Sequence, residues 1–148
     1  MIQGQWFAPG NDISPLLPVR MSVFGRGGDD IDARSWNALV FEDGVPAASG
    51  RIWYREGAYW IGDICVTESY RGRRLGDLVL RLLLFKAQSH AAPEVRLFCP
   101  VVLSGFFSRL GFNSVKETGD TLEMALRGDQ IKLDGCKSCR KADCPSRH

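Results

Sequence analysis

The residues with the clearest chemical potential stand in one short segment, Arg71-Gly-Arg-Arg-Leu-Gly76, which holds three arginines and two glycines. An apolar run precedes this segment and a longer apolar run follows it. If the first run is a strand and the second a helix, free amides at the helix N-terminus and the positive end of its dipole lie beside the arginines. The segment therefore predicts a pyrophosphate site, and the plain alternative is a solvated basic turn before a core helix.

A second candidate group is Asp63, the one carboxylate inside the apolar run 59–66. Burial would raise the pKa of this carboxyl towards that of a useful general base. Buried polar groups usually have partners, so a structural aspartate that bridges neighbouring strands is the competing interpretation. Glu56 and Glu68 fall at turns and are expected to be solvated. Asp63 is thus a candidate base or orienting group, and a proton path through water is the alternative.

A third candidate group closes the chain, where Cys136, Cys139, Cys144 and His148 follow the pattern Cys-x-x-Cys-x4-Cys-x3-His. Three thiolates and an imidazole match a closed tetrahedral zinc site. The pair Cys144-Pro145 is also found in iron–sulfur ligation, although the spacing differs from that of ferredoxins. A basic tail with reduced thiols is the interpretation without a metal.

The bulk properties predict one soluble domain with a short tail. The chain has 148 residues and a net charge of only +2, which is too small to argue for binding of nucleic acid. Residues 127–148 carry +3 and the remainder −1. We divide the chain into a domain at residues 1–127 and a basic, Cys-rich tail at 128–148. No membrane helix and no signal peptide are visible, so a cytoplasmic protein with isolated, reduced Cys65 and Cys99 is expected.

Hydrophobic periodicity predicts an alternation of strands and helices. Asp-Gly and Glu-Gly pairs between β-favouring runs indicate tight hairpins. An apolar segment with one narrow polar stripe indicates a helix packed on a sheet. The predicted strands are residues 4–8, 36–41, 48–54, 59–66, 95–99, 112–115 and 121–126. The predicted helices are residues 13–24, 75–88 and 105–110, with Ser104 as the N-cap of the last.

Three motifs resemble those of the GNAT N-acyltransferase superfamily. Arg71-Gly-Arg-Arg-Leu-Gly76 is similar to its acyl-CoA motif, Arg/Gln-x-x-Gly-x-Gly/Ala, with Arg74 in place of the middle glycine, which glucosamine-phosphate acetyltransferases also lack. Phe106-Phe-Ser-Arg-Leu-Gly-Phe112 is similar to the later Phe-Tyr-x-x-x-Gly-Phe. Arg20-Met-Ser-Val-Phe24 with Asp32 resembles a branch with Arg-x-x-Val-Phe before an acidic loop.

The resemblance covers about residues 4–126. It implies an α/β (α+β) fold class with a central, mixed, mostly antiparallel sheet of six to seven strands, flanked by about four helices. It also implies direct transfer of an acyl group, most simply acetyl from acetyl-CoA, to an amine acceptor. A homodimer and a protein partner for the tail remain open. The residues that the resemblance assigns to CoA are Ile64, Cys65, Val66, Arg71, Gly72, Arg73, Arg74, Leu75, Gly76, Asp77 and Phe107.

Phe107 occupies the position of the family's usual general acid, a tyrosine, and phenylalanine cannot donate a proton. Another hydroxyl would then serve, with Tyr59 and Ser104 as first candidates and Tyr54 and Ser108 beside them. Otherwise the thiolate leaves without an acid, or transfer is slow or absent. The aromatic residues Trp53, Tyr54, Tyr59 and Trp60 are best interpreted as strand packing, with an acceptor pocket as the alternative.

Two functions from different classes follow. The first is an N-acetyltransferase with CoA and an amine as substrates. The second is a catalytically weak CoA-binding module whose tail senses a metal or redox state, or docks a partner. Binding of nucleic acid through the basic tail is a third and weaker idea, because no aromatic residues are interleaved with its charges.

Overall fold

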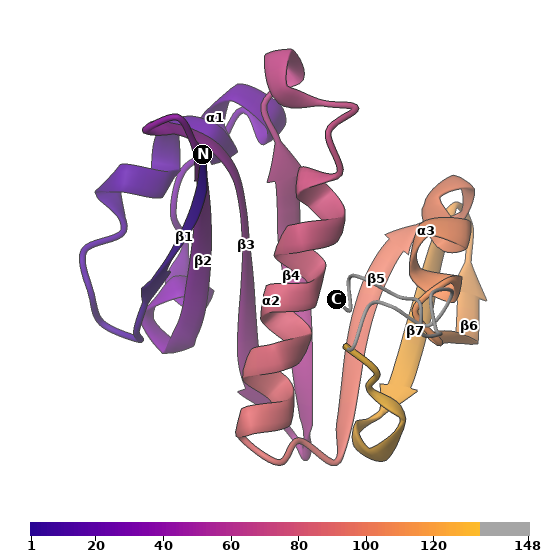
Figure 1. The fold of residues 1–148 in the computed structure, drawn as a ribbon. Coiled ribbons are helices and arrows are strands. Elements are labelled where there is room, and N and C mark those ends of the chain that lie inside the picture. Colours follow the sequence, from indigo (N-terminus) through magenta and orange to yellow (C-terminus); the bar gives the residue numbers. More distant parts are fainter. Residues whose placement is uncertain (134–148) are drawn as a thin grey trace, which may run out of the picture.

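A computed structural model describes residues 1–133, which form one seven-stranded sheet and three α-helices. The strand order is β1-β2-β3-β4-β5-β7-β6, with β4 and β5 parallel and all other neighbours antiparallel (Figure 1). The strands are β1 (Ile2–Phe7), β2 (Ser35–Glu42), β3 (Val45–Arg55), β4 (Ala58–Val66), β5 (Glu94–Pro100), β6 (Asn113–Thr118) and β7 (Thr121–Arg127). The helices are α1 (Leu17–Phe24), α2 (Leu75–Ser89) and α3 (Ser104–Ser108). The predicted fold class is confirmed.

The two tight hairpins of the N-terminal meander form where Asp-Gly and Glu-Gly predicted them. Asp43 and Gly44 both have positive φ angles, 51° and 82°, and Glu56 and Gly57 repeat the pattern at 50° and 86°. Positive φ at both central positions gives the backbone twist that matches two antiparallel strands. Strands β2, β3 and β4 are therefore positioned by local turn chemistry.

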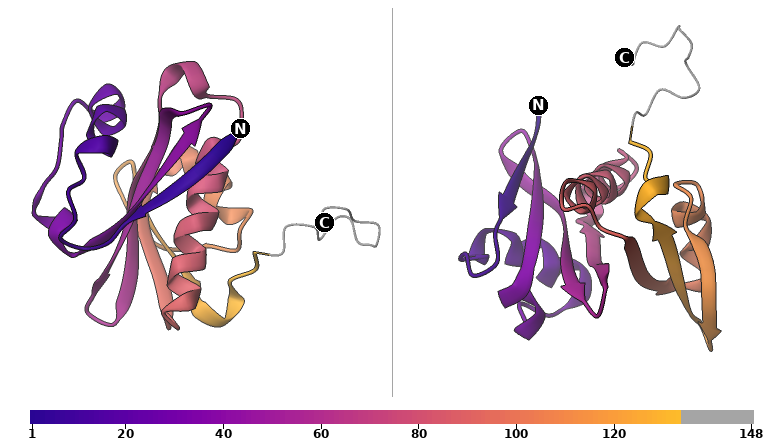
Figure 2. Two further views of the ribbon diagram at one scale, coloured as in Figure 1. Left: turned by 60° about the vertical axis from the view of Figure 1, so that its left-hand side comes forward. Right: turned by 90° about the horizontal axis from the view of Figure 1, so that it is seen from below.

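The sheet is covered on both faces, as Figure 2 shows. Helix α2 buries leucine and valine side chains in the larger core, and α1 covers the opposite face, where Leu16 and Val19 meet Cys65. Gly50 lets α2 approach β3 closely, since a Cβ there would lie 2.7 Å from a methyl group of Val79. The apolar pattern of α2 thus fixes its distance from the middle of the sheet.

Strands β4 and β5 pair over only three residues. Tyr59, Trp60 and Ile61 face Val95, Arg96 and Leu97, and the register ends there. Residues 62–66 of β4 have no pairing with β5, and the two strands diverge towards the end of the sheet at which α2 begins (Figure 1). Two parallel strands that separate in this way leave a wedge-shaped gap between them, and a cavity described below lies in this gap.

Two details differ from the sequence expectations. Ser104 was expected to cap α3, but the cap is Leu103, Ser104 is the first helical residue, and no side chain caps the helix. The predicted domain boundary after residue 127 does not coincide with the end of packing, because Ile131 is buried in the larger core. The division into domain and tail stays a prediction.

Candidate functional site

The Arg/Gly segment forms the turn between β4 and α2. A short 3-10 turn, Glu68–Tyr70, follows β4, and α2 begins after Arg74. Arg74 has φ 64° and ψ 22°, the left-handed conformation that glycine favours. The arginine at the family's middle glycine position therefore keeps the turn that glycine would make. The first amides of the 15-residue helix α2 open towards this turn.

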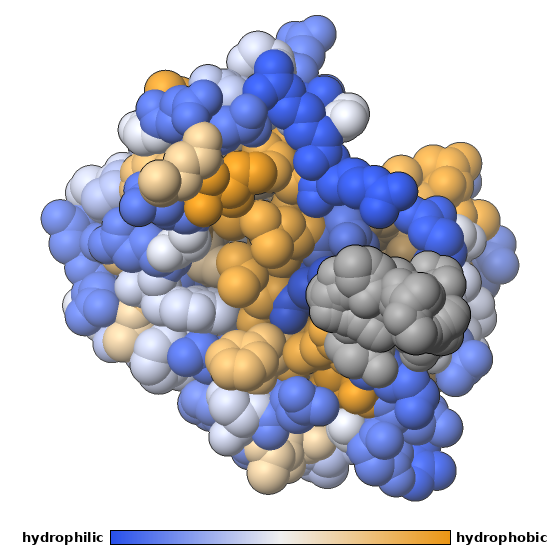
Figure 3. Space-filling view, in the orientation of Figure 1, coloured by the Kyte–Doolittle hydropathy of each residue, from blue (hydrophilic) through white to orange (hydrophobic). Residues whose placement is uncertain are grey.

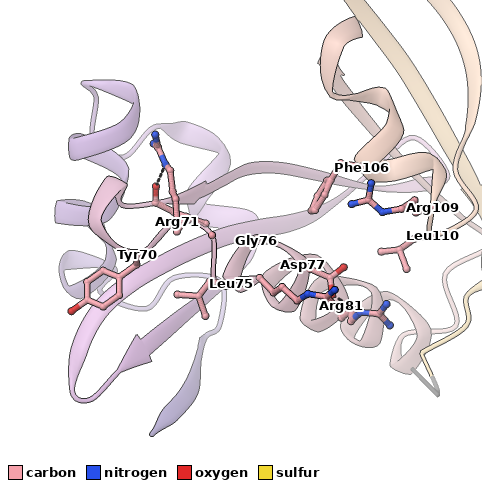
Figure 4. A pocket seen from close by; sticks show the side chains of 12 residues that line it. Tyr70, Arg71, Leu75, Gly76, Asp77, Arg81, Phe106, Arg109 and Leu110 are labelled. Atoms are coloured by element: carbon pink, nitrogen blue, oxygen red, sulfur yellow. Dashed lines mark hydrogen bonds and ion pairs between the residues drawn. The ribbon is translucent and has the colours of Figure 1, made fainter. Parts of the chain in front are cut away.

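A cavity of about 540 Å³ lies at this turn, between the start of α2 and α3 (Figure 4). Hydrophilic residues form a band from the top of the molecule towards α3 in the space-filling view, while apolar residues gather along α2 (Figure 3). The residues that line the cavity are Val66, Tyr70, Arg71, Gly72, Arg74, Leu75, Gly76, Asp77, Arg81, Phe106, Arg109 and Leu110. We refer to it as the phosphate pocket, after the ligand that the sequence predicts for this turn.

The three arginines of the turn do not act alike. Arg74 lines the phosphate pocket, and so does Arg71, whose Nε donates to the carbonyl of Val66 at 3.0 Å. Arg73, expected to bind the cofactor, is not on the lining, and its guanidinium forms an ion pair with Glu42 of β2. The structure gives no geometric support to the prediction for Arg73.

Five further residues of the pocket were missed by sequence reasoning, and the first of them, Tyr70, ends the 3-10 turn that follows β4. Arg81 lies two turns into α2, and Phe106, Arg109 and Leu110 come from α3 and the residues that follow it. The spacing of Arg81 on the polar stripe of α2 was visible in the sequence. Nothing in the sequence alone showed that α3 would face that stripe.

A second cavity, of about 320 Å³, fills the wedge between β4 and β5. Two of the residues predicted to bind CoA, Ile64 and Phe107, lie on its lining. We refer to it as the apolar pocket. Its lining consists of Phe24, Ile61, Gly62, Asp63, Ile64, Leu97, Phe98, Cys99, Pro100, Leu103 and Phe107. None of these residues carries a hydroxyl, and the titratable groups among them are Asp63 and Cys99.

The two isolated cysteines are buried, as expected. Cys65 points to the α1 face, where its Sγ lies 3.5 Å from the hydroxyl of Ser49, so only its main chain can serve a ligand on the α2 face. Burial raises the pKa of the Cys65 thiol and that of the Cys99 thiol. Both are therefore neutral thiols at physiological pH rather than nucleophilic thiolates.

Asp63 lies on a β-bulge and binds three arginines. The register of β3 and β4 shifts opposite this residue, and its φ angle is 53°. Its two carboxylate oxygens accept from Arg26 at 2.6 and 3.1 Å, and Oδ2 lies 3.4 Å from both Arg20 Nε and Arg51 Nη2. An orienting or structural role agrees with these contacts better than that of a free base, and the role of base stays a prediction.

The arginines of Asp63 extend into a larger network beneath α1. Arg20 is fully buried and donates to Asp32 at 2.8 and 3.1 Å and to the side-chain oxygen of Asn37 at 3.1 Å. Arg51 donates to Asp29 and lies 3.1 Å from Asp32. Three guanidinium and three carboxylate groups thus balance one another. The network ties the loop between α1 and β2 to the bulge beside the apolar pocket.

Asp32 makes this network sensitive to acid. Burial opposes its ionisation, but hydrogen bonds from Arg20 and the Asp29 amide, with the charges of Arg20 and Arg51, outweigh burial and lower the pKa of Asp32 from 3.8 to about 2. A pKa depressed in the folded state stabilises the protein above the unfolded value, and this stabilisation is lost as the pH falls through the folded value. The free energy of unfolding should therefore decrease between about pH 4 and 2.

This prediction can be checked by urea unfolding at a series of pH values. Asp32→Asn should be less stable than the wild type at pH 6, and its stability should fall less steeply below pH 4. Asp30→Asn, on the exposed side of the same turn, is the matched control and should follow the wild type. Parallel curves for wild type and Asp32→Asn would show that Asp32 does not cause the acid sensitivity.

The structure does not place the hydroxyl side chains that were predicted as general acids, Tyr59 and Ser104, on the lining of either pocket. Tyr59 lies at the far end of β4, roughly 23 Å from Val66 at about 3.3 Å per residue. Its hydroxyl lies 3.5 Å from His90 Nδ1. Ser104 is absent from both linings, although its neighbour Leu103 lines the apolar pocket. Their predicted catalytic roles lack geometric support.

The aromatic residues of the β3–β4 hairpin divide into two groups. Tyr54 and Tyr59 pack edge to face against each other, remote from both pockets. Trp60 stacks on Phe98 at 5.2 Å, and Phe98 lines the apolar pocket. Packing explains the tyrosines, while Trp60 supports a wall of the pocket.

The tail candidates Cys136, Cys139, Cys144 and His148 lie outside the described residues, so a zinc or iron–sulfur site there stays a prediction. Within residues 1–133, no group of three or more His, Cys, Asp or Glu side chains is arranged to hold a metal ion. In the same part of the chain, no helix has the length and apolar character needed to cross a bilayer.

Solved structures with this fold include several acyltransferases. ElaA of Escherichia coli superposes with a TM-score of 0.71 at 25% identity, over 84% of this chain and 99% of that one. An acyl-CoA N-acyltransferase from Pseudomonas aeruginosa gives 0.76 at 21% identity, over 84% and 99%. A GNAT family acetyltransferase from Elizabethkingia anophelis, solved with acetyl-CoA bound, gives 0.67 at 13%, over 85% and 97%.

The sequence itself matches a family model. No protein of curated function matches this sequence. The model of the acetyltransferase (GNAT) family matches residues 15–112, which include α1, the sheet from β2 to β5, the phosphate pocket and α3. The chain therefore belongs to the GNAT acetyltransferase family.

Proposed function

We propose that this protein transfers an acetyl group from acetyl-CoA to a primary amine by direct attack. One observation carries the proposal: the phosphate pocket and the apolar pocket both border the end of β4 that is not paired with β5. Val66 lines the first pocket and Ile64, two residues earlier, lines the second. A CoA thioester can therefore place its diphosphate at the turn and extend its pantetheine arm beside β4 into the wedge.

The proposed chemistry forms a C–N bond and breaks a C–S bond. The amine attacks in its neutral form, main-chain donors of residues 64–66 stabilise the carbonyl oxygen as it gains charge, and CoA leaves as the thiolate. The proton lost by the amine passes to water. Asp63, held by its arginines, shapes the wall of the apolar pocket on the side of α1.

The test is release of free thiol from acetyl-CoA across a panel of small amines and peptides with free amino groups. Amine-dependent release together with the acetylated product is the expected result. Heat of CoA binding is measured on the same material by calorimetry. Absence of both binding and release would contradict the proposal.

A second function is favoured by one observation. Phe107 is buried on the lining of the apolar pocket, so the family's usual proton donor is replaced by a hydrocarbon ring. A CoA-binding module with weak or absent transfer would have this feature. Tight binding of CoA without thiol release for any amine would support this second function over the first.

A further inference from the structure

The phosphate pocket carries more positive charge than a diphosphate requires. Four arginines line it, Arg71, Arg74, Arg81 and Arg109, and the carboxylate on its lining is Asp77. The buried network beneath α1 is balanced, with three charges of each sign, whereas this pocket has an excess of three positive charges. A ligand with a further anionic group would match this excess.

The four arginines fall into two pairs. Arg71 and Arg74 belong to the turn, while Arg81 and Arg109 come from α2 and from the end of α3 (Figure 4). Arg81 lies six residues beyond Leu75, about 9 Å along the helix axis at 1.5 Å per residue. One ribose can separate two phosphate groups by a distance of this order.

The second pair is positioned and only partly neutralised within residues 1–133. Asp77 accepts from Arg81 Nε at 2.9 Å, one helical turn away, which holds the side chain and leaves both terminal nitrogens without a partner there. The Arg109 guanidinium lies 5.7 Å from the centre of the Phe106 ring and makes no ion pair in that part of the chain. Both groups can donate to an anion in the pocket.

We infer that Arg81 and Arg109 bind the 3′-phosphate of coenzyme A. This inference rests on the proposed use of acyl-CoA. The diphosphate occupies the turn, the ribose crosses the pocket beside Phe106 and Leu110, and the phosphomonoester lies between the two guanidinium groups. Planar guanidinium groups suit such a ligand, since each can donate two parallel hydrogen bonds to phosphate oxygens. The pair would thus select CoA over dephospho-CoA.

Calorimetric binding of CoA and dephospho-CoA tests this inference without knowledge of the acceptor. The wild type should bind CoA roughly 10- to 100-fold more tightly, since hydrogen bonds between charged groups contribute about 1.5–3 kcal/mol. In the double variant Arg81→Gln/Arg109→Gln the two dissociation constants should converge. The variant's affinity for dephospho-CoA should change less than threefold. Arg34→Gln, an exposed arginine outside the pocket, is the control and should keep the wild-type ratio.

The outcomes separate the two proposals. Equal affinity of the wild type for both ligands would overturn this inference and leave the proposed function in place. If the double variant lost the same factor of affinity for both ligands, this inference would also be overturned and the proposed function would stand. Such a result would assign the two arginines to the diphosphate. Failure of the wild type to bind either ligand would overturn the proposed function and the inference together. Circular dichroism establishes that the variants are folded.

Discussion

The double variant Arg74→Asp/Gly76→Val should lose CoA binding by at least about 100-fold and remain folded. The aspartate places a negative charge where the diphosphate would lie and removes a guanidinium from the pocket. The valine methyl groups fill the space above the first turn of α2. A Cβ at residue 76 would lie 3.6 Å from Val66 and 3.9 Å from Phe106, which are ordinary contacts, so the substitution blocks the ligand without straining the protein.

Calorimetry with CoA measures this loss, and thermal unfolding measures the stability. The fold should tolerate the change because aspartate adopts the left-handed conformation of residue 74 more readily than most residues and favours a helix N-terminus. Arg34→Asp makes the same change of charge outside the pocket and should bind CoA as the wild type does. Retained affinity in the double variant would place the ligand elsewhere on the molecule.

The features that could be predicted from sequence are those set by local chemistry. The Asp-Gly and Glu-Gly turns determined the β2–β4 meander, and the apolar pattern of residues 75–88 determined α2, because positive φ angles and helical periodicity depend on neighbouring residues. The turn at residues 71–76 was found for the same reason. Its glycines, arginines and following helix are contiguous in the chain.

The features that could not be predicted depend on how distant elements meet. Asp63 appeared as an isolated carboxylate in a strand, since the bulge opposite Gly50 and the arginines of α1 and β3 cannot be read from residues 59–66. The same is true of Arg109, which reaches the phosphate pocket only because α3 faces α2. Arg73 shows the reverse error. Its position in the motif suggested that it binds the cofactor, but it forms an ion pair with Glu42 at the end of β2 instead.

Phe107→Tyr should raise kcat by about 10- to 100-fold if protonation of the departing thiolate limits the reaction. This gain does not exceed the lower end of the roughly 100- to 10,000-fold that general acid catalysis typically contributes. Phe107 is 7% exposed and lines the apolar pocket, the space assigned to the thioester. A tyrosine there would supply the hydroxyl donor that the pocket's described lining lacks. The measurement is thiol release with the most reactive amine of the panel, at saturating acetyl-CoA.

The pH profile and a control substitution make this result specific. A phenol donates a proton only below its own pKa, near 10, so the gain in kcat should disappear as the pH rises past that value. Phe85→Tyr introduces the same hydroxyl on the exposed side of α2, outside both pockets, and should leave kcat unchanged. If Phe107→Tyr leaves kcat at the wild-type value across the pH range, the thiolate departs without help and another step limits turnover. If the wild type shows no turnover and Phe107→Tyr creates it, the loss of this hydroxyl accounts for an inactive CoA-binding module.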